Sequence, residues 1–202
     1  MFLHMPTLKR LTKVAFNSKK LTIGKINDGT FMDCGLFIAW FDDNYIPNKV
    51  KALIMEFAGE LPEEGHPFKA SKEGNQYEID QNDYWNVQKR IKDATERYVV
   101  TPVALESKYT SCRLLQQARD PYNIKAIDGI AITLIDPAEA DYENGENTPQ
   151  GPFSDTKGKI FWWKSDFCIL GFCGTKLYTD IATDVQHALE GIELDEDKKE
   201  VE

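Results

Sequence analysis

Apolar and polar residues alternate in short runs over the first part of the chain, a pattern that predicts β-strands. Residues 8–16 and 20–26 fit two strands, and Asn27-Asp28-Gly29 after them tolerates the positive φ of a tight hairpin turn. A third strand is predicted over 31–41, where the apolar run from Leu36 to Phe41 is typical of a strand covered on both faces. The pattern therefore predicts an N-terminal meander.

A second pattern, with apolar residues recurring every three to four positions, predicts amphipathic helices. It is clearest over 49–60, which ends beside Gly59 and Pro62, and it recurs over 82–97, 109–119 and 180–190. Residues 62–75 between the first two are polar and are expected to form a loop. Each helix has one apolar face, so we expect these helices to cover a sheet.

Strands are predicted again in the second half, over 99–105, 124–135 and 159–174. The last of these, KIFWWKSDFCILGFCG, contains two tryptophans, two cysteines and three phenylalanines. It follows a long polar loop over 137–158. Such a strand lies at the centre of a core or forms a contact surface, and the sequence leaves both readings open.

Taken together, the predicted elements indicate an α+β fold with a mainly antiparallel sheet of about five to seven strands and three or four amphipathic helices. A partly parallel sheet in the second half is the alternative. The chain has 202 residues and shows no repeat or linker composition, so residues 1–192 are predicted to form a single domain. Residues 193–202 are predicted to be an acidic C-terminal tail.

The charge distribution narrows the classes of partner. The formal net charge is −9, which argues against a broad nonspecific grip on duplex DNA but not against a local basic groove. The first 25 residues are basic, and the acids gather at 136–146 and 193–202. No apolar window approaches the ~20 residues of a membrane span and no signal-peptide pattern is present, so we expect a cytoplasmic protein without membrane contacts.

Cysteine and histidine offer little chemistry at the sequence level. The four cysteines, Cys34, Cys112, Cys168 and Cys173, lack the paired spacing of zinc sites. We therefore expect them to be buried as small hydrophobic residues, and we expect neither a metal nor a cofactor. The three histidines, His4, His66 and His187, fall in no metalloprotease or other catalytic pattern. A metal-dependent hydrolase would need acids such as Asp42 and Asp43 to converge with others, and the sequence leans away from an enzyme.

Residues 136–146, which we call the acidic loop, offer a first candidate contact surface. Its donors do not fit the register of an EF-hand, so a solvated, mobile loop is the preferred interpretation, and it is the natural contact for a basic partner. The candidate contact residues are Glu139, Asp141, Glu143 and Glu146.

The aromatic strand offers a second candidate. Trp162 and Trp163 are adjacent, so on a strand they point to opposite faces of the sheet. With Lys164 beside them, an open face would form a stacking platform for single-stranded nucleic acid, and the alternative is that helices cover both rings.

These observations lead to three hypotheses of different classes. The first is a non-enzymatic interaction protein: an assembly subunit, for example of a virion, an adaptor, or an acidic inhibitor of a basic protein partner. The second is a single-stranded nucleic-acid-binding protein with an aromatic platform and an acidic tail. The third and weakest is the metal-dependent hydrolase. Homo-oligomers are compatible with each.

Overall fold

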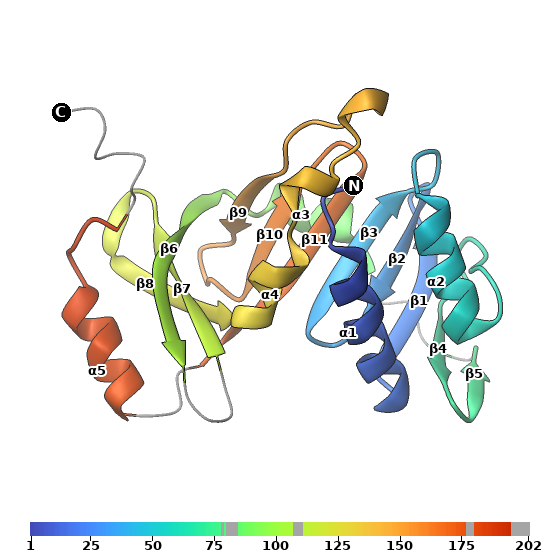
Figure 1. Cartoon of the computed structure of the whole chain (residues 1–202), viewed down its shortest axis with the longest axis horizontal. Coiled ribbons are helices and arrows are strands. Elements are labelled where there is room, and N and C mark those ends of the chain that lie inside the picture. The colour runs from blue at the N-terminus through green and yellow to red at the C-terminus, as the bar shows by residue number, and fades with distance from the viewer. Residues whose placement is uncertain (78, 80–84, 107–110, 177–179, 195–202) are drawn as a thin grey trace.

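The computed structural model describes residues 1–77, 79, 85–106, 111–176 and 180–194, with only the backbone described for 180–182. Within these residues eleven strands form one antiparallel sheet, accompanied by five short α-helices (Figure 1). The prediction of about five to seven strands with three or four helices was therefore wrong, because several segments interpreted as loop or helix are strands and the first predicted strand is a helix. The expected single domain over 1–192 stays a prediction, and residues 195–202 of the predicted tail lie outside the described residues.

The strands are named in chain order. They are β1 (Leu21–Ile26), β2 (Gly29–Asp33), β3 (Phe37–Asp42), β4 (Phe68–Ser71), β5 (Gly74–Gln76), β6 (Glu96–Glu106), β7 (Ser111–Gln117), β8 (Asp120–Asp128), β9 (Gln150–Ser154), β10 (Ile160–Lys164) and β11 (Cys168–Thr175). The α-helices are α1 (Met5–Asn17), α2 (Asn48–Ala58), α3 (Val87–Lys92), α4 (Gly129–Leu134) and α5 (Asp180–Leu189), and two short 3₁₀-helices are η2 (Pro137–Glu139) and η3 (Tyr142–Asn144).

Strand β11 is the junction of the sheet. Cys168–Phe172 pair with β3 on one side, Ile169–Cys173 pair with β10 on the other, and the last two residues pair with β8. Pairings of β10 with β9, β9 with β6, β6 with β7 and β7 with β8 then close a circuit of six strands. From β3 the sheet continues outward through β2, β1 and β4 to β5.

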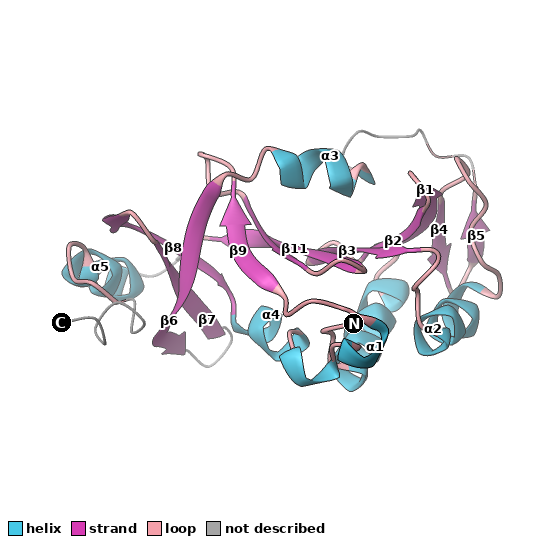
Figure 2. Ribbon diagram, turned by 90° about the horizontal axis from the view of Figure 1, so that it is seen from above, coloured by secondary structure: helices cyan, strands magenta, loops and turns pink. Residues whose placement is uncertain are grey.

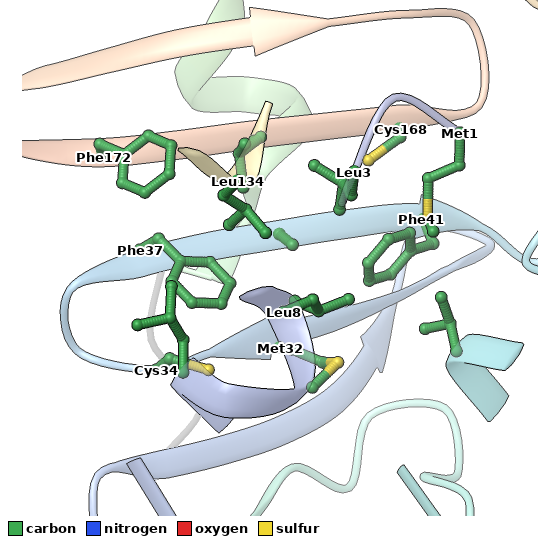
Figure 3. Packing of buried hydrophobic residues seen from close by; sticks show 14 of the residues in the cluster. Met1, Leu3, Leu8, Met32, Cys34, Phe37, Phe41, Leu134, Cys168 and Phe172 are labelled. Atoms are coloured by element: carbon green, nitrogen blue, oxygen red, sulfur yellow. The ribbon is translucent and has the colours of Figure 1, made fainter. Parts of the chain in front are cut away.

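Helices cover both faces of the sheet around β3 and β11. Seen from above, α1, α2 and α4 lie on one face and α3 lies on the other (Figure 2). The larger buried cluster lies under α1, α2 and α4 and includes Leu8, Phe37, Phe41 and Phe172 (Figure 3). The smaller cluster joins Trp40 and the neighbouring strands to α3 on the other face.

Several predicted elements are confirmed. Helix α2 matches the helix predicted over 49–60 and ends at Gly59, which adopts a φ of 77°. Asn27 and Asp28 have φ values of 53° and 56° in the β1–β2 turn. The predicted burial of Leu36–Phe41 on both faces holds for β3, because alternate residues of this strand belong to the two clusters.

The N-terminal segment is the largest local error. Residues 8–16 form part of α1 and not a strand. The buried side chains are Leu8, Leu11, Thr12 and Ala15, which have the i, i+3, i+4, i+7 spacing of a helix face. These positions do not alternate as a strand would require, and Pro6 in the first turn marks the helix start.

Three other predicted segments have a different secondary structure or are interrupted in the structure. Residues 31–41 divide into β2 and β3 around Gly35, whose φ is 77°. Of the helix predicted over 109–119, residues 109–110 lie outside the described residues and Ser111–Gln117 form strand β7, because pairing with β6 and β8 on its two sides outweighs the helical spacing of its apolar residues. The strand predicted over 124–135 becomes helix α4 after Asp128, whose carboxylate accepts a hydrogen bond from the backbone N–H of Ile130 at 3.0 Å.

The remaining differences concern element length. Of the helix predicted over 82–97, only Val87–Lys92 is helical, as α3; Glu96 and Arg97 begin β6, and residues 82–84 lie outside the described residues. The predicted loops over 62–75 and 137–158 contain β4, part of β5, and β9. The aromatic strand over 159–174 is a hairpin, β10 and β11, joined by a turn at 165–167.

Candidate functional site

The structure buries both tryptophans of β10. Trp162 is 3% exposed and Trp163 is 5% exposed. Trp163 packs edge-on against Phe172 in the larger cluster, with ring centroids 5.9 Å apart. Trp162 lies in the cluster under α3, where the guanidinium of Arg90 is 5.1 Å from its ring centroid. Helices therefore cover both faces, and neither ring is open to stack on a base.

Lys164, the third predicted residue of this strand, is exposed. Its ammonium lies 5.9 Å from the centroid of the Phe153 ring on β9, so the residue belongs to the β9–β10 surface and not to a tryptophan platform.

The acidic loop is organised by a buried carboxylate. Glu146 is 2% exposed and accepts hydrogen bonds from the backbone N–H of Asp141 at 2.7 Å and from Ser165 Oγ. It also forms an ion pair with the N-terminal ammonium of Met1. A buried carboxylate is tolerated when its oxygens are hydrogen-bonded and its charge is paired, and both conditions hold here. Glu146 is therefore an internal anchor, not a surface contact as the sequence suggested.

The first residues of the chain hold the start of the same loop. Met1, Phe2 and Leu3 are buried, and Met1 and Leu3 lie beside Phe41 and Cys168 in the core (Figure 3). The carbonyl of Phe2 accepts a hydrogen bond from the backbone N–H of Asp136 at 2.8 Å. The Met1 ammonium donates to the carbonyl of Glu139 at 3.2 Å. The loop is thus fixed at its beginning by the N-terminus and at its end by Glu146.

The other three predicted acids stay on the surface. Glu139, Asp141 and Glu143 are all exposed. Glu139 is paired with Lys49 at the start of α2 at 2.9 Å, and the hydrogen bond and charge of this ammonium lower the pKa of Glu139 below its usual value. Asp141 accepts a hydrogen bond from Asn144 Nδ2 at 2.7 Å, which holds the turn of η3.

Aromatic side chains that sequence reasoning missed lie beside these acids. Tyr45 stacks on Phe167 of the β10–β11 turn with ring centroids 4.0 Å apart and planes 6° from parallel, and 52% of Tyr45 is exposed. Tyr142 of η3 is also exposed. Residue 166 in the same turn is tied to the loop, because Asp166 accepts a hydrogen bond from Asn147. The sequence signal for this contact between the β10–β11 turn and the loop was the polar pair Ser165-Asp166, which interrupts the aromatic run.

These residues form one surface, which we call the acidic end surface. Its members come from the acidic loop, the β10–β11 turn and the segment before α2; they are Tyr45, Glu139, Asp141, Tyr142, Glu143, Asp166 and Phe167. Aromatic rings and carboxylates side by side suit a partner that presents Lys or Arg among apolar groups, since cations pair with both.

Other candidate chemistry is structural in the described part of the chain. No cluster of three or more His, Cys, Asp and Glu residues there is arranged to hold a metal ion. Asp43 pairs with Lys25 at 2.6 Å and accepts a hydrogen bond from Thr30, and Asp42 accepts one from the backbone N–H of Asn44. These two acids therefore serve the turn after β3, and they do not converge with further acids as a hydrolase would require.

The cysteines and His187 also have structural surroundings. All four cysteines are free, and burial raises the pKa of the Cys34 and Cys168 thiols far above the usual value. His187 on α5 is exposed and lies 3.0 Å from the carboxylate of Glu190 on the same helical end.

Comparison with known proteins gives no functional assignment. No protein-family model, curated protein or solved structure significantly matches the chain. None of the helices in the described residues is long and apolar enough to cross a membrane.

Proposed function

We propose that this protein is a non-enzymatic interaction protein that binds a basic protein partner through the acidic end surface. It acts as an assembly subunit, an adaptor or an inhibitor, and it works in the cytoplasm. The observation that carries the proposal is the buried Glu146. A loop of solvated acids has no need of an internal ion pair, whereas a loop held in one conformation presents its charges in a fixed pattern.

A rigid surface favours recognition because little conformational entropy is lost when a partner binds to it. The loop is held by Glu146, by the N-terminal backbone and by the Lys49–Glu139 pair. Between these anchors the carboxylates of Asp141 and Glu143 are exposed next to Tyr142. The stacked Tyr45–Phe167 pair supplies apolar area at the other side of the surface.

The test compares two sets of charge-neutralising substitutions. In the first, Glu139→Gln, Asp141→Asn and Glu143→Gln remove three charges from the surface while keeping side-chain hydrogen-bond acceptors. In the matched control, Glu63→Gln, Glu64→Gln and Asp184→Asn remove three exposed charges elsewhere. Binding of a short Lys/Arg-rich peptide containing one tyrosine is measured by fluorescence anisotropy at low and moderate salt.

We expect the surface variant to bind about 3- to 150-fold more weakly, since three charge contacts of about 0.2–1 kcal/mol each are lost. The control variant should change affinity by less than about twofold, and the affinity should fall with added salt. Equal weakening in both variants would mean that only net charge matters, and the proposal would be refuted. A natural partner captured from a lysate must pass the same comparison.

The single-stranded nucleic-acid hypothesis has less support. It depends on an open aromatic face, and both β10 rings are covered by other residues. Homo-oligomer formation through the acidic end surface is disfavoured because two copies of the same acidic surface repel each other.

A further inference from the structure

The outer side of helix α1 is basic. Its exposed residues include Lys9, Arg10, Lys13 and Val14, which the helical spacing places on one side of the helix. The opposite side of α1 is buried in the larger cluster. We call the exposed side, formed by Lys9, Arg10, Lys13 and Val14, the α1 face.

Two cations of the α1 face are not neutralised by the fold. Lys9 pairs with Glu56 on α2 at 2.7 Å. Across the residues that the structure describes, neither Arg10 nor Lys13 forms an ion pair with a carboxylate. Val14 on the same face is 60% exposed. In a protein with a net charge of −9, this local positive surface with an apolar residue suits an acidic partner.

The acidic end surface has the complementary composition. Its exposed carboxylates include Asp141 and Glu143, and the exposed ring of Tyr142 lies next to them. Ammonium and guanidinium groups are attracted both to carboxylates and to the faces of aromatic rings. The two surfaces therefore fit each other in charge, and each of them also has an apolar part.

One molecule does not bring its own two surfaces together. Met1 and Phe2, which precede α1, hold the acidic loop, so this loop lies beyond the N-terminal end of the helix while the α1 face lies along its side (Figure 1). None of the ion pairs among the described residues joins Arg10 or Lys13 to the loop. The buried side of α1 holds the helix against the sheet. Contact between the two surfaces therefore requires a second molecule.

We propose that the acidic end surface of one copy binds the α1 face of a second copy in a head-to-tail contact. This inference rests on the proposed function, because it names the basic partner of the same surface. Repulsion between two acidic end surfaces opposes a symmetric dimer, whereas the head-to-tail contact pairs surfaces of opposite charge. Such a heterologous contact leaves one surface of each kind unoccupied at the two ends, so it generates a ring or an open chain of copies.

The contact should be weak, because α1 is short. A helix of 13 residues is about 20 Å long, so its exposed side offers a small and polar interface. The net negative charge of each copy also opposes association. At about 0.1 M salt the Debye length is about 10 Å, so distant charges are screened and the charges that meet at the contact decide the outcome.

The experiment is sedimentation equilibrium of the full chain at about 0.1 M salt, over about 10–500 μM protein. The wild type should form dimers and larger species as its concentration rises. The helix variant, Arg10→Glu with Lys13→Glu, should associate at least about fivefold more weakly, because attraction is replaced by repulsion. The matched control, Lys69→Glu with Lys72→Glu, reverses two exposed charges elsewhere and changes the net charge equally, so it should change association by less than about twofold.

A mixture of two defective variants distinguishes a head-to-tail contact from other modes of association. The helix variant keeps the acidic end surface, and the surface variant with Glu139→Gln, Asp141→Asn and Glu143→Gln keeps the α1 face. Each variant alone should remain largely monomeric over this concentration range. Their mixture should form a dimer of one copy of each and nothing larger, because that dimer contains no second matching pair of surfaces.

Three results would overturn the inference: a wild-type chain that stays monomeric over this range, equal weakening in the helix variant and the lysine control, or a mixture that forms no dimer. Single-stranded oligonucleotide that binds the wild type but not the helix variant, without association between copies, would assign the α1 face to nucleic acid and overturn it as well.

Binding of the Lys/Arg-rich peptide separates a failure of this inference from a failure of the proposed function. The helix variant should bind that peptide as tightly as the wild type, because its acidic end surface is unchanged. If the peptide binds but the copies do not associate, only the head-to-tail contact is refuted. If the acidic end surface binds neither the peptide nor a second copy, both proposals are refuted.

Discussion

Replacing Glu146 by glutamine tests the anchor of the acidic loop directly. The change keeps the shape of the side chain but removes the charge that faces the buried Met1 ammonium. One glutamine oxygen can still accept a single hydrogen bond, from Asp141 or from Ser165, while its NH₂ group cannot replace the second acceptor. The ammonium then lies buried opposite a neutral side chain.

Breaking a buried ion pair by removing one partner costs about 3–5 kcal/mol, because the remaining charge is left uncompensated. For a domain of this size, each 1 kcal/mol lowers the midpoint of thermal unfolding by about 2–4 °C. Glu146→Gln should therefore lower it by about 6–20 °C. The measurements are calorimetry and urea unfolding followed by tryptophan fluorescence, on the chain beginning at Met1.

The matched control is Glu143→Gln, an exposed acid three residues away whose loss should change stability by no more than about 0.5 kcal/mol. Acetylating the Met1 amine removes the other charge of the pair. If the ion pair is the cause, acetylation should cost much less in the Glu146→Gln protein than in the wild type. A stability loss below about 1 kcal/mol for Glu146→Gln, or additive effects of the two changes, would refute the reasoning.

Three other outcomes follow from burial and close packing. Cys34 and Cys168 should resist alkylation by iodoacetamide in the folded protein at pH 8, because burial raises the pKa of both thiols. Mass spectrometry should show modification only after unfolding. Rapid labelling of the native protein would contradict this prediction. Gly171→Ala should lower the free energy of unfolding by about 1–3 kcal/mol, because the new Cβ would lie 2.4 Å from the ring of Trp162 on the paired strand. In Gly59→Ala, at an uncrowded position, the loss of stability should come from the positive φ alone. Titration with single-stranded oligonucleotide should leave the tryptophan emission unchanged at about 50 mM salt, since both β10 rings are covered; strong quenching removed by Trp162→Ala would revive the nucleic-acid hypothesis.

The sequence predicted well the elements whose pattern is long or whose ends are marked. Helix α2 has a full apolar stripe and a glycine at its end, and β3 has an apolar run too continuous for a half-exposed strand. The segments that were wrong have short patterns decided by distant neighbours. Strand β7 is a strand because β6 and β8 pair with it, and its own residues carry no local signal strong enough to show this.

The candidate site was also predicted only in part. The acids of the loop are visible in the sequence, and Glu139, Asp141 and Glu143 lie on the surface as expected. Nothing in the composition distinguishes Glu146, because its burial depends on Met1 and Ser165, which are brought to it only by the fold.

The position of β11 as the junction of the sheet has a consequence for synthesis. The outer edge of β3 has its partner in β11, more than 120 residues later in the chain. At about 5–20 residues per second, roughly 6–25 s of translation separate the two. During that interval the first three strands carry an apolar, unpaired edge that invites association with other chains. Truncated products that end before Cys168 keep this edge permanently, so they should depend on chaperones for solubility in a way that the full chain does not.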